Sequence, residues 1–279
     1  MSYSRVYVEI TNICNMNCSF CHGHSRPNDM MSLETFKTVL EQLRGKTKYI
    51  YYHLMGEPLL HPMLPLFLKT AKEQGFHSMI TTNGTLLDTC GDAILESGLH
   101  KVNISVHSFE NGSENAFSDY MEDLIRFAKK ADEKGVIVVF RLWNQGYDNG
   151  RNERVLSFLK EQLSGEWSEN SRGLKIRNKL FLEWGERFVW PDKDATLYDN
   201  DVFCYGMRDH FGILCDGTVV PCCLDSDGVI SLGNILQTSL DNILSSDRAR
   251  AMKKGFECRT ASEDLCKRCG YAQRWSLEQ

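Results

Sequence analysis

Residues 6–21 read Val-Tyr-Val-Glu-Ile-Thr-Asn-Ile-Cys-Asn-Met-Asn-Cys-Ser-Phe-Cys, so a loop with three cysteines directly follows a short apolar run. The run at 6–10 is rich in β-branched residues and predicts a strand. Cys14, Cys18 and Cys21 can bind three irons of a four-iron cluster and leave the fourth without a protein ligand. A three-cysteine zinc site completed by His22 or His24 is the alternative.

The first 190 residues alternate between strand and helix patterns. Ser32 has the form of a helix N-cap, and glycines follow three later helical stretches. Such alternation implies a parallel sheet with right-handed crossovers, and six units favour an open, partial (β/α)6 TIM-like barrel over a closed one of eight. The predicted strands are 6–10, 49–55, 79–82, 102–107, 136–143 and 180–184; the predicted helices are 33–43, 62–74, 87–97, 117–134 and 152–163.

The pattern changes after residue 190. Residues 191–202 contain a proline and four aspartates and read as a linker, and short cysteine-rich pieces follow. We therefore predict an α/β protein with a barrel at 1–190 and a small cysteine-rich C-terminal domain at 191–279.

Composition narrows the function classes. The 279 residues include 11 cysteines, an odd number that excludes complete disulfide pairing and favours metal or cluster binding. The net charge of −5 makes nucleic acid an unlikely main partner. No apolar run approaches the roughly 20 residues of a membrane span, and the N-terminus shows no signal-peptide pattern. We expect a cytoplasmic protein with no membrane partner.

The motifs C-N-M-N-C-S-F-C at 14–21 and M-G-E-P-L-L at 55–60 resemble those of the radical S-adenosylmethionine (SAM) superfamily. The resemblance implies that S-adenosylmethionine (AdoMet) binds the open iron of a [4Fe–4S] cluster. It also implies reductive cleavage of AdoMet to a 5′-deoxyadenosyl radical, and hence an electron donor such as flavodoxin or ferredoxin.

The same resemblance assigns residues to AdoMet, each near the end of a predicted strand. Phe20 corresponds to the aromatic residue beside the adenine, and Gly56 with Glu57 to the segment that binds the methionine amino group. Met55 replaces a glycine that the family often has there. Further matches are Thr82 and Asn83 with Gly84 in a T-N-G turn, Ser105 as an AdoMet contact, and Arg141 as a partner of the AdoMet carboxylate.

A second cysteine group resembles the auxiliary-cluster domain called SPASM, in its shortened twitch form, because no further cysteine follows Cys269. The resemblance implies a second [4Fe–4S] cluster; a zinc site is again the alternative. Cys215, Cys223 and Cys258 remain possible substitutes, although strand alternation argues against Cys222 and Cys223 reaching one cluster. Cys90 is predicted to be a buried core residue. The implied ligands are Cys204, Cys222, Cys266 and Cys269.

The sequence leaves the substrate and the catalytic acid or base open. Polar residues at predicted strand ends are candidates for substrate contact: Glu9, His53, His107, Trp143 and Glu183, with His22 and His24 beside the cluster loop. Since the two predicted domains use nearly the whole chain, we expect a small-molecule substrate.

Relatives imply two reactions, dehydrogenation of an aminocyclitol-like polyol and C–C or C–N cleavage of a queuine-like deazapurine. The alternatives are a peptide-modifying or sulfatase-maturing enzyme and a non-enzymatic metal protein.

Overall fold

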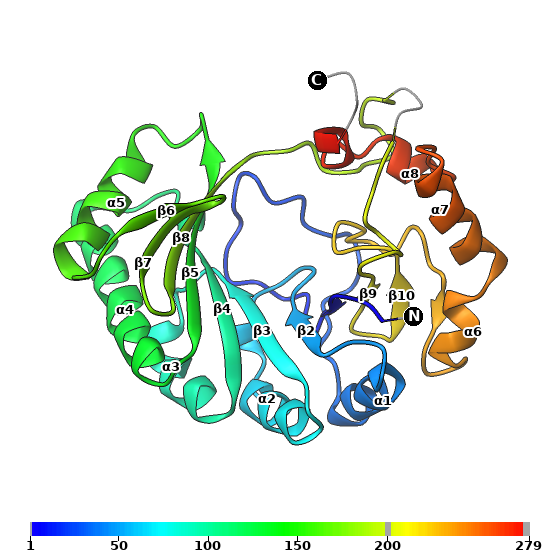
Figure 1. Ribbon diagram of the computed structural model, residues 1–279, viewed down its shortest axis with the longest axis horizontal. Helices are drawn as coiled ribbons and strands as arrows, with labels where there is room; N and C mark the ends of the chain where they lie inside the picture. The colour runs from blue at the N-terminus through cyan, green and yellow to red at the C-terminus, as the bar shows by residue number, and fades with distance from the viewer. Residues whose placement is uncertain (1, 199–201, 276–279) are drawn as a thin grey trace.

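The computed structural model describes residues 2–198 and 202–275, so part of the predicted linker, 199–201, lies outside the described residues. Figure 1 shows a curved sheet with helices on its outer side and the loop after the first strand on its inner side. The sheet has 11 strands in the order β11-β10-β9-β1-β2-β3-β4-β5-β8-β7-β6. An α/β fold with a large parallel sheet and a cysteine-rich C-terminal region confirms the predicted partial barrel.

Six strands of this sheet run parallel to their barrel neighbours, as predicted. Five helices cross between them and cover the outer face (Figure 1). The strands are β1 (Val6–Val8), β2 (Tyr49–Tyr52), β3 (His77–Thr82), β4 (Leu99–Ser105), β5 (Ile137–Gln145) and β8 (Leu180–Glu186). The helices are α1 (Leu33–Leu43), α2 (Leu64–Glu73), α3 (Leu87–Glu96), α4 (Glu114–Glu133) and α5 (Arg151–Gln162).

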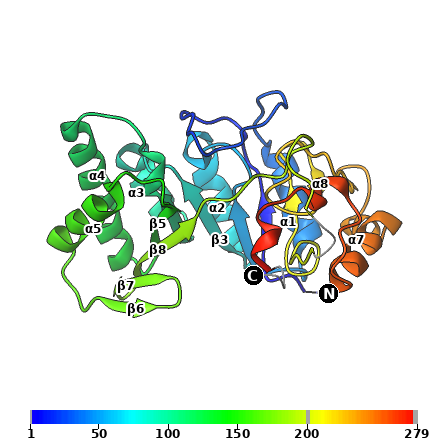
Figure 2. The same ribbon diagram turned by 90° about the horizontal axis from the view of Figure 1, so that it is seen from above.

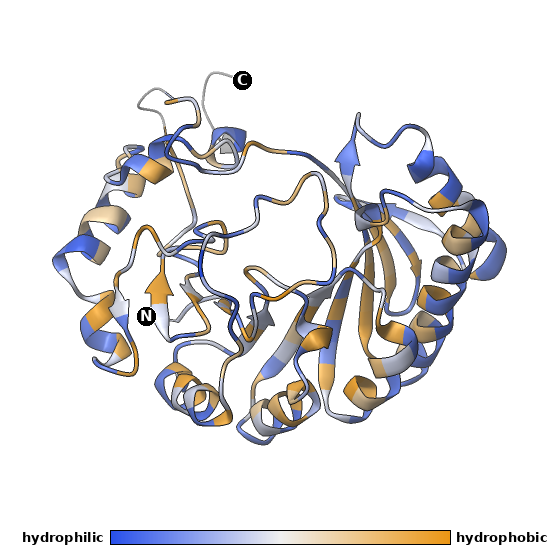
Figure 3. Cartoon of the chain, turned by 180° about the vertical axis from the view of Figure 1, so that it is seen from behind, coloured by the Kyte–Doolittle hydropathy of each residue, from blue (hydrophilic) through white to orange (hydrophobic). Residues whose placement is uncertain are grey.

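Capping side chains and glycines determine where the helices begin and end. Ser32 caps α1, because its hydroxyl accepts a hydrogen bond from the Thr35 N–H at 3.1 Å. Gly135 ends α4 in the left-handed conformation at φ +73°. Each helix turns an apolar stripe toward the sheet, and in Figure 3 hydrophobic residues concentrate along the central strands.

Two details of the barrel differ from the predictions. β2 ends at Tyr52 and β4 at Ser105, so His107 lies in a 3-10 turn, Val106–Ser108, rather than in a strand. The second difference is an antiparallel hairpin between α5 and β8, formed by β6 (Ser168–Asn170) and β7 (Gly173–Arg177). β6 is exposed along its whole length, so it lacks the alternation that signals a strand.

The cysteine-rich region continues the barrel sheet. β9 pairs in parallel with β1, and the N–H groups of Tyr7 and Glu9 donate to the carbonyls of Phe211 and Ile213 at 3.0 and 2.8 Å. Because β1 lies between β9 and β2, the sheet crosses the predicted domain boundary; the division at 190 stays a prediction. The remaining elements are β9 (Gly212–Ile213), β10 (Thr218–Val220), β11 (Gly233–Asn234), α6 (Leu240–Leu244), α7 (Asp247–Glu257) and α8 (Asp264–Lys267).

Helix length and hydropathy bear on membrane association. Within the described ranges, none of the helices is long and apolar enough to cross a membrane.

Candidate active site and metal centres

The loop after β1 carries the first three cysteines at one end of the barrel, opposite the β6–β7 hairpin (Figure 2). A turn brings Cys18 and Cys21 together, with the Cys21 N–H donating to the Cys18 carbonyl at 3.1 Å. The Met16 N–H donates to Cys14 Sγ at 3.4 Å. Such N–H···S contacts stabilise the thiolates that bind iron–sulfur clusters. The predicted cluster ligands therefore share one short, partly exposed loop.

The charge state of these thiols depends on what they bind. Burial, together with the nearby Glu110, Cys21 and Cys14, raises the pKa of Cys18 to about 12. A thiolate at this position requires a compensating positive charge, which cluster iron supplies. The donor set thus fits a cluster bound by three cysteines.

Gly56 and Glu57 lie against the base of the loop, where the Glu57 N–H donates to the Ile13 carbonyl at 2.8 Å. Their contact with AdoMet stays a prediction. Gly56 has φ +76°, and a Cβ there would meet the Thr11 carbonyl oxygen at 2.4 Å, so only glycine fits. The buried Glu57 carboxyl accepts hydrogen bonds from the Leu59 and Asn83 N–H groups at 3.0 and 2.7 Å. Burial raises the pKa of Glu57 to about 7. Glu57 thereby joins the turns after β2 and β3.

The other residues predicted to bind AdoMet lie on or just after β3, β4 and β5. Thr82 and Ser105 end β3 and β4, whereas Arg141 lies in the middle of β5, although the sequence predicts it near the end of that strand. The Asn83 amide donates to Asn15 Oδ1 at 2.8 Å, and Thr82 Oγ1 accepts from the Gly84 N–H at 3.0 Å. Ser105 is opposite Arg141 in the β4–β5 register. Their roles toward AdoMet stay predictions.

Phe20 and His107 pack together beside the loop. Their ring centroids are 4.7 Å apart, and His107 Nδ1 lies 2.9 Å from the Arg141 carbonyl oxygen. Burial lowers the pKa of His107 to about 4, so this ring is neutral at physiological pH. The Trp190 indole N–H donates to the Phe20 carbonyl at 3.0 Å. The pair closes the side of the loop that faces β4.

A cavity of about 430 Å³ lies between the barrel interior and the C-terminal cysteines. Three of the predicted substrate contacts, His53, Trp143 and Glu183, line it together with Arg141. Arg141 Nε is 3.8 Å from Glu183 Oε2, and its guanidinium carbon lies 4.6 Å from the Trp143 ring centroid. Burial and the charges of Arg141 and Arg5 lower the pKa of His53 to about 3.

The four predicted auxiliary ligands converge on the same cavity. Cys204, Cys222, Cys266 and Cys269 all line it, and the Gly206 N–H donates to Cys204 Sγ at 3.3 Å. Across residues 2–198 and 202–275, no three His, Cys, Asp or Glu side chains are spaced to hold a single metal ion.

The structure corrects the reason given for separating Cys222 from Cys223. Both follow β10 in a turn rather than a strand, so strand alternation does not apply, and both line the cavity. The charges of Cys204, Cys266 and Cys269 act on the pKa of Cys222, and Cys223 has a side-chain hydrogen bond with Tyr7 but also lies within electrostatic reach of Cys204 and Cys269. Cys223 therefore stays an alternative to Cys222.

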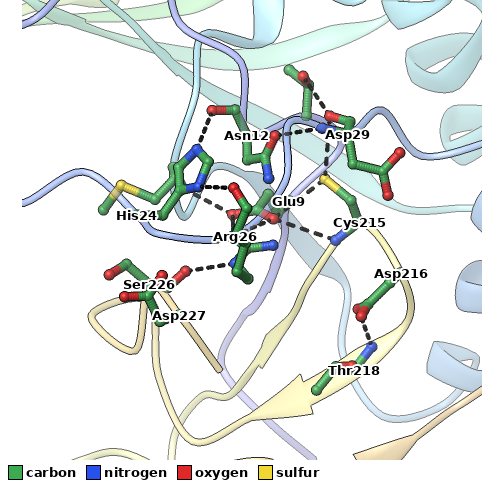
Figure 4. A network of polar contacts seen from close by, with 12 residues as sticks. Glu9, Asn12, His24, Arg26, Asp29, Cys215, Asp216, Thr218, Ser226 and Asp227 are labelled. Atoms are coloured by element: carbon green, nitrogen blue, oxygen red, sulfur yellow. Dashed lines mark hydrogen bonds and ion pairs between the residues drawn. The ribbon is translucent and has the colours of Figure 1, made fainter. Parts of the chain in front are cut away.

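Glu9 occupies a different place, a buried network drawn in Figure 4. Both carboxylate oxygens accept from Arg26 Nη2 at 2.8 Å, and the Cys215 thiol donates to Oε1 at 3.3 Å. Arg26 Nε donates to the Ser226 carbonyl at 2.8 Å, and the Ser25 N–H donates to Asp227. The network joins the end of the cluster loop to the turns after β9 and β10.

The other histidines and cysteines that the sequence analysis singled out lie apart from the cavity and do not gather at one place. His24 Nε2 lies 3.0 Å from the Asn12 carbonyl oxygen, within the loop, and His22 lies 3.4 Å from Asp192. Cys90 is half-buried and packs against the core, and Cys258 is exposed at the end of α7.

Sequence reasoning did not single out several cavity residues, among them the cations Arg5, Lys101 and Arg172. Arg5 precedes β1, Lys101 lies early in β4, and Arg172 lies in the β6–β7 turn. The first two could have been found from their position beside predicted strands. Arg172 depends on a hairpin without a sequence signal.

Comparison with known proteins places this geometry in a family. Residues 8–159 match the radical SAM superfamily, and residues 204–270 match SPASM, an iron-sulfur cluster-binding domain. A GTP 3′,8-cyclase of Chlorobaculum tepidum is 35% identical over 109 residues, which are 38% of this chain and 33% of that enzyme. A probable GTP 3′,8-cyclase of Sulfolobus acidocaldarius is 26% identical over 273 residues, covering 83% of this chain and 85% of that protein.

Solved structures share the fold. BtrN in complex with AdoMet and 2-DOIA has a TM-score of 0.59 at 20% identity, covering 96% of this chain and 94% of that one. The enzyme anSMEcpe with bound AdoMet and a Kp18Cys peptide has a TM-score of 0.65 at 16% identity, covering 99% and 91%. The family and domain matches imply AdoMet and two [4Fe–4S] clusters, one primary and one auxiliary. The chain therefore belongs to the radical SAM superfamily and is a radical SAM enzyme with a C-terminal SPASM/twitch domain.

Proposed function

We propose that this radical SAM enzyme abstracts a hydrogen atom from a small molecule held in the 430 Å³ cavity. The substrate radical would then either break a C–C or C–N bond, or lose a proton and pass one electron to the auxiliary cluster, which would complete a dehydrogenation. The observation that carries the proposal is the position of this cavity. Barrel residues line one side and four C-terminal cysteines line the other. The volume of about 430 Å³ includes the space beside these cysteines that the auxiliary cluster would fill, and the space beside the barrel residues is left for the substrate.

We assign Cys14, Cys18 and Cys21 to the primary cluster. The auxiliary ligands are Cys204, Cys222, Cys266 and Cys269. When bound, the primary cluster and AdoMet supply a 5′-deoxyadenosyl radical.

The polypeptide contributes binding and orientation. Gly56 lets the turn after β2 approach the loop, and Phe20 offers a flat surface beside it. Inside the cavity, Arg141 and Trp143 form a platform, and Glu183 supplies a hydrogen-bond acceptor. Neutral His53, whose Nδ1 lies 3.2 Å from Thr81 Oγ1, orients polar groups of the substrate. These contacts hold one substrate C–H toward the cluster loop.

The primary test measures 5′-deoxyadenosine after anaerobic reconstitution with iron, sulfide, AdoMet and a flavodoxin-type or chemical reductant. The wild type should release it, and Cys14→Ala should abolish release, because the cluster loses a ligand. Cys90→Ala is the matched control, since Cys90 packs against the core away from both cysteine groups. Release that persists in Cys14→Ala would refute the primary ligand set.

The auxiliary set has a separate readout. Cys266→Ala should lower iron content by about four atoms per chain while AdoMet binding persists, because the primary loop is intact. Metabolite profiling then identifies a compound whose loss tracks 5′-deoxyadenosine. A peptide substrate in that assay would favour a peptide-modifying function.

A further inference from the structure

One end of the cavity carries a group of positive charges. Arg5, Lys101, Arg141 and Arg172 line it, and Lys101 lies within electrostatic reach of the three arginines and of Glu183. Glu183 is the carboxylate that acts on Lys101. Arg274 and the four cysteines assigned to the auxiliary cluster also line the cavity. Asp225 also lines the cavity, but its oxygens accept from two backbone N–H groups. The whole chain has a net charge of −5, so this positive group is a local feature.

Most of this charge is not neutralised by the protein. Glu183 lies 3.8 Å from Arg141, which leaves three cations. Arg5 Nε donates to the Tyr7 hydroxyl at 3.0 Å, and the Arg5 guanidinium carbon is 5.9 Å from the Tyr7 and Tyr51 ring centroids. None of the ion pairs within the described part of the chain involves Arg5, Lys101 or Arg172.

Placing several positive charges close together in a cavity costs free energy. Burial lowers the pKa of Lys101, and the three arginines lower it further against the opposing effect of Glu183. Arg141 Nε is buried and has no hydrogen-bond partner among the residues that the structure describes. Clefts lined by one sign of charge attract ligands of the opposite sign.

We propose that the substrate carries an oxyanion group, a phosphate or a carboxylate, which Arg5, Lys101 and Arg172 bind. This inference rests on the proposed function, in which the cavity is the substrate site. Guanidinium groups match phosphate and carboxylate oxygens in a two-pronged geometry, and Lys101 adds a point charge. The aromatic rings of Tyr7 and Tyr51 beside Arg5 accommodate the remainder of the molecule. An amine such as an aminocyclitol would be repelled.

The position of Arg5 and Arg172 in the barrel indicates how a bound oxyanion would orient the substrate. Arg5 precedes β1, whereas the cysteine loop follows β1, so the two lie at opposite ends of that strand. Arg172 lies in the turn of the β6–β7 hairpin, which Figure 2 shows at the barrel end opposite the cysteine loop. An oxyanion bound there fixes one end of the substrate and leaves the other directed toward the loop. Binding far from the reacting atom thus orients the C–H bond.

Calorimetry on the reconstituted holoenzyme with saturating AdoMet tests the inference. The probes are inorganic pyrophosphate, glutarate and the cationic control putrescine. We expect at least one anion to bind, and Lys101→Gln to weaken it about 10-fold or more, since a charge-assisted contact is lost. Lys134→Gln is the matched control, because Lys134 lies at the C-terminal end of α4, outside the cavity, and pairs with Glu96.

The outcomes distinguish a phosphate from a carboxylate, and they also show whether the cavity has an oxyanion site at all. Binding of pyrophosphate alone identifies a phosphate, and binding of glutarate alone identifies a carboxylate. If neither anion binds, if putrescine binds more tightly than both, or if Lys101→Gln and Arg5→Gln leave the affinity unchanged, the oxyanion site is wrong. Release of 5′-deoxyadenosine is measured separately, so failure of the enzyme proposal is recognised independently of anion affinity.

A thermal measurement guards against variants that simply misfold. Lys101→Met should raise the unfolding midpoint of the anion-free holoenzyme, because it removes one of the repelling charges, and should abolish the upward shift that the bound anion causes in the wild type. A structural role for Lys101 predicts the opposite sign, and a lowered midpoint would overturn the inference.

Discussion

The environment of His53 makes the stability of the folded protein depend on pH. Burial, Arg141 and Arg5 lower its pKa from 6.5 to about 3 in the folded protein. The unfolded chain therefore binds more protons between these values, and the stabilisation present above about pH 6.5 is lost as the pH falls toward 3. A neutral imidazole in the cavity is thus maintained at the expense of stability in acid.

The His53→Gln variant tests this linkage. Between about pH 7 and about pH 5.5 the wild type should lose about 1 kcal/mol of unfolding free energy through His53, and the variant should lack that loss. Denaturant unfolding at the two pH values measures the difference. His77→Gln, at the exposed start of β3, should retain the wild-type dependence. A His53→Gln profile that follows the wild type would show that folding does not lower the pKa of this ring.

At the scale of elements, the Glu9–Arg26 pair joins the cluster loop to the turns after β9 and β10 (Figure 4). The Glu9 side chain is 0% exposed and that of Arg26 is 17% exposed, so removal of Arg26 alone leaves a buried carboxylate without its cation. Such an unpaired charge is much more costly than loss of the pair as a whole.

We expect Arg26→Gln to lower the unfolding free energy by about 3–5 kcal/mol. The double variant with Glu9→Gln should cost less than this single change. Arg154→Gln removes an exposed ion pair with Glu114 and should cost less than about 1 kcal/mol. Denaturant unfolding under anaerobic conditions provides all three values. Equal effects of Arg26→Gln and Arg154→Gln would mean that the pair does not hold the loop.

The predicted elements succeeded where the signal is local. Ser32 and Gly135 mark helix ends within a few residues of those observed, because capping depends on neighbours in the chain. The β6–β7 hairpin was missed because β6 buries none of its side chains. The pairing of β9 with β1 was missed because no local pattern encodes which distant strand completes a sheet.

The site residues likewise fall into those that a local pattern indicates and those that depend on contacts between distant parts of the chain. The short three-cysteine motif predicted that Cys14, Cys18 and Cys21 share one loop. The grouping of Cys204, Cys222, Cys266 and Cys269, which are far apart in the chain, was implied by the resemblance to SPASM, and their role as ligands stays a prediction. Glu9 was expected beside the substrate, whereas the structure places its carboxylate on Arg26; alternation gave its face but not its partner. Arg5, Lys101 and Arg172 come from three separate elements, and only the folded chain shows that they share a cavity.

At the scale of the whole molecule, the barrel and the cysteine-rich region share one core. The main buried cluster extends from Tyr3 to Ala272 and includes Phe211 and Ile213, both 0% exposed. β9 also supplies the carbonyls that accept from the Tyr7 and Glu9 N–H groups. The predicted first domain therefore lacks part of its own packing when taken alone.

A chain ending at residue 202 should not unfold in a cooperative transition, because β1 becomes an unpaired edge and its apolar contacts are lost. A chain ending at residue 262 keeps β9, β10 and β11 and should unfold cooperatively. Circular dichroism during thermal unfolding compares the two. A cooperative transition of the shorter chain near the full-length midpoint would show an autonomous barrel.

The pairing of β9 with β1 also determines an order of events during synthesis. Val8 emerges early, but its partner Ile213 follows about 205 residues later. At roughly 5–20 residues per second, the first strand waits on the order of 10–40 s for its neighbour. The loop that carries the three cysteines is also without its anchor during that interval, because Arg26 donates to the carbonyl of Ser226, which follows Ile213 in the chain. The cysteines therefore lie on an unanchored loop until about three quarters of the chain has been made.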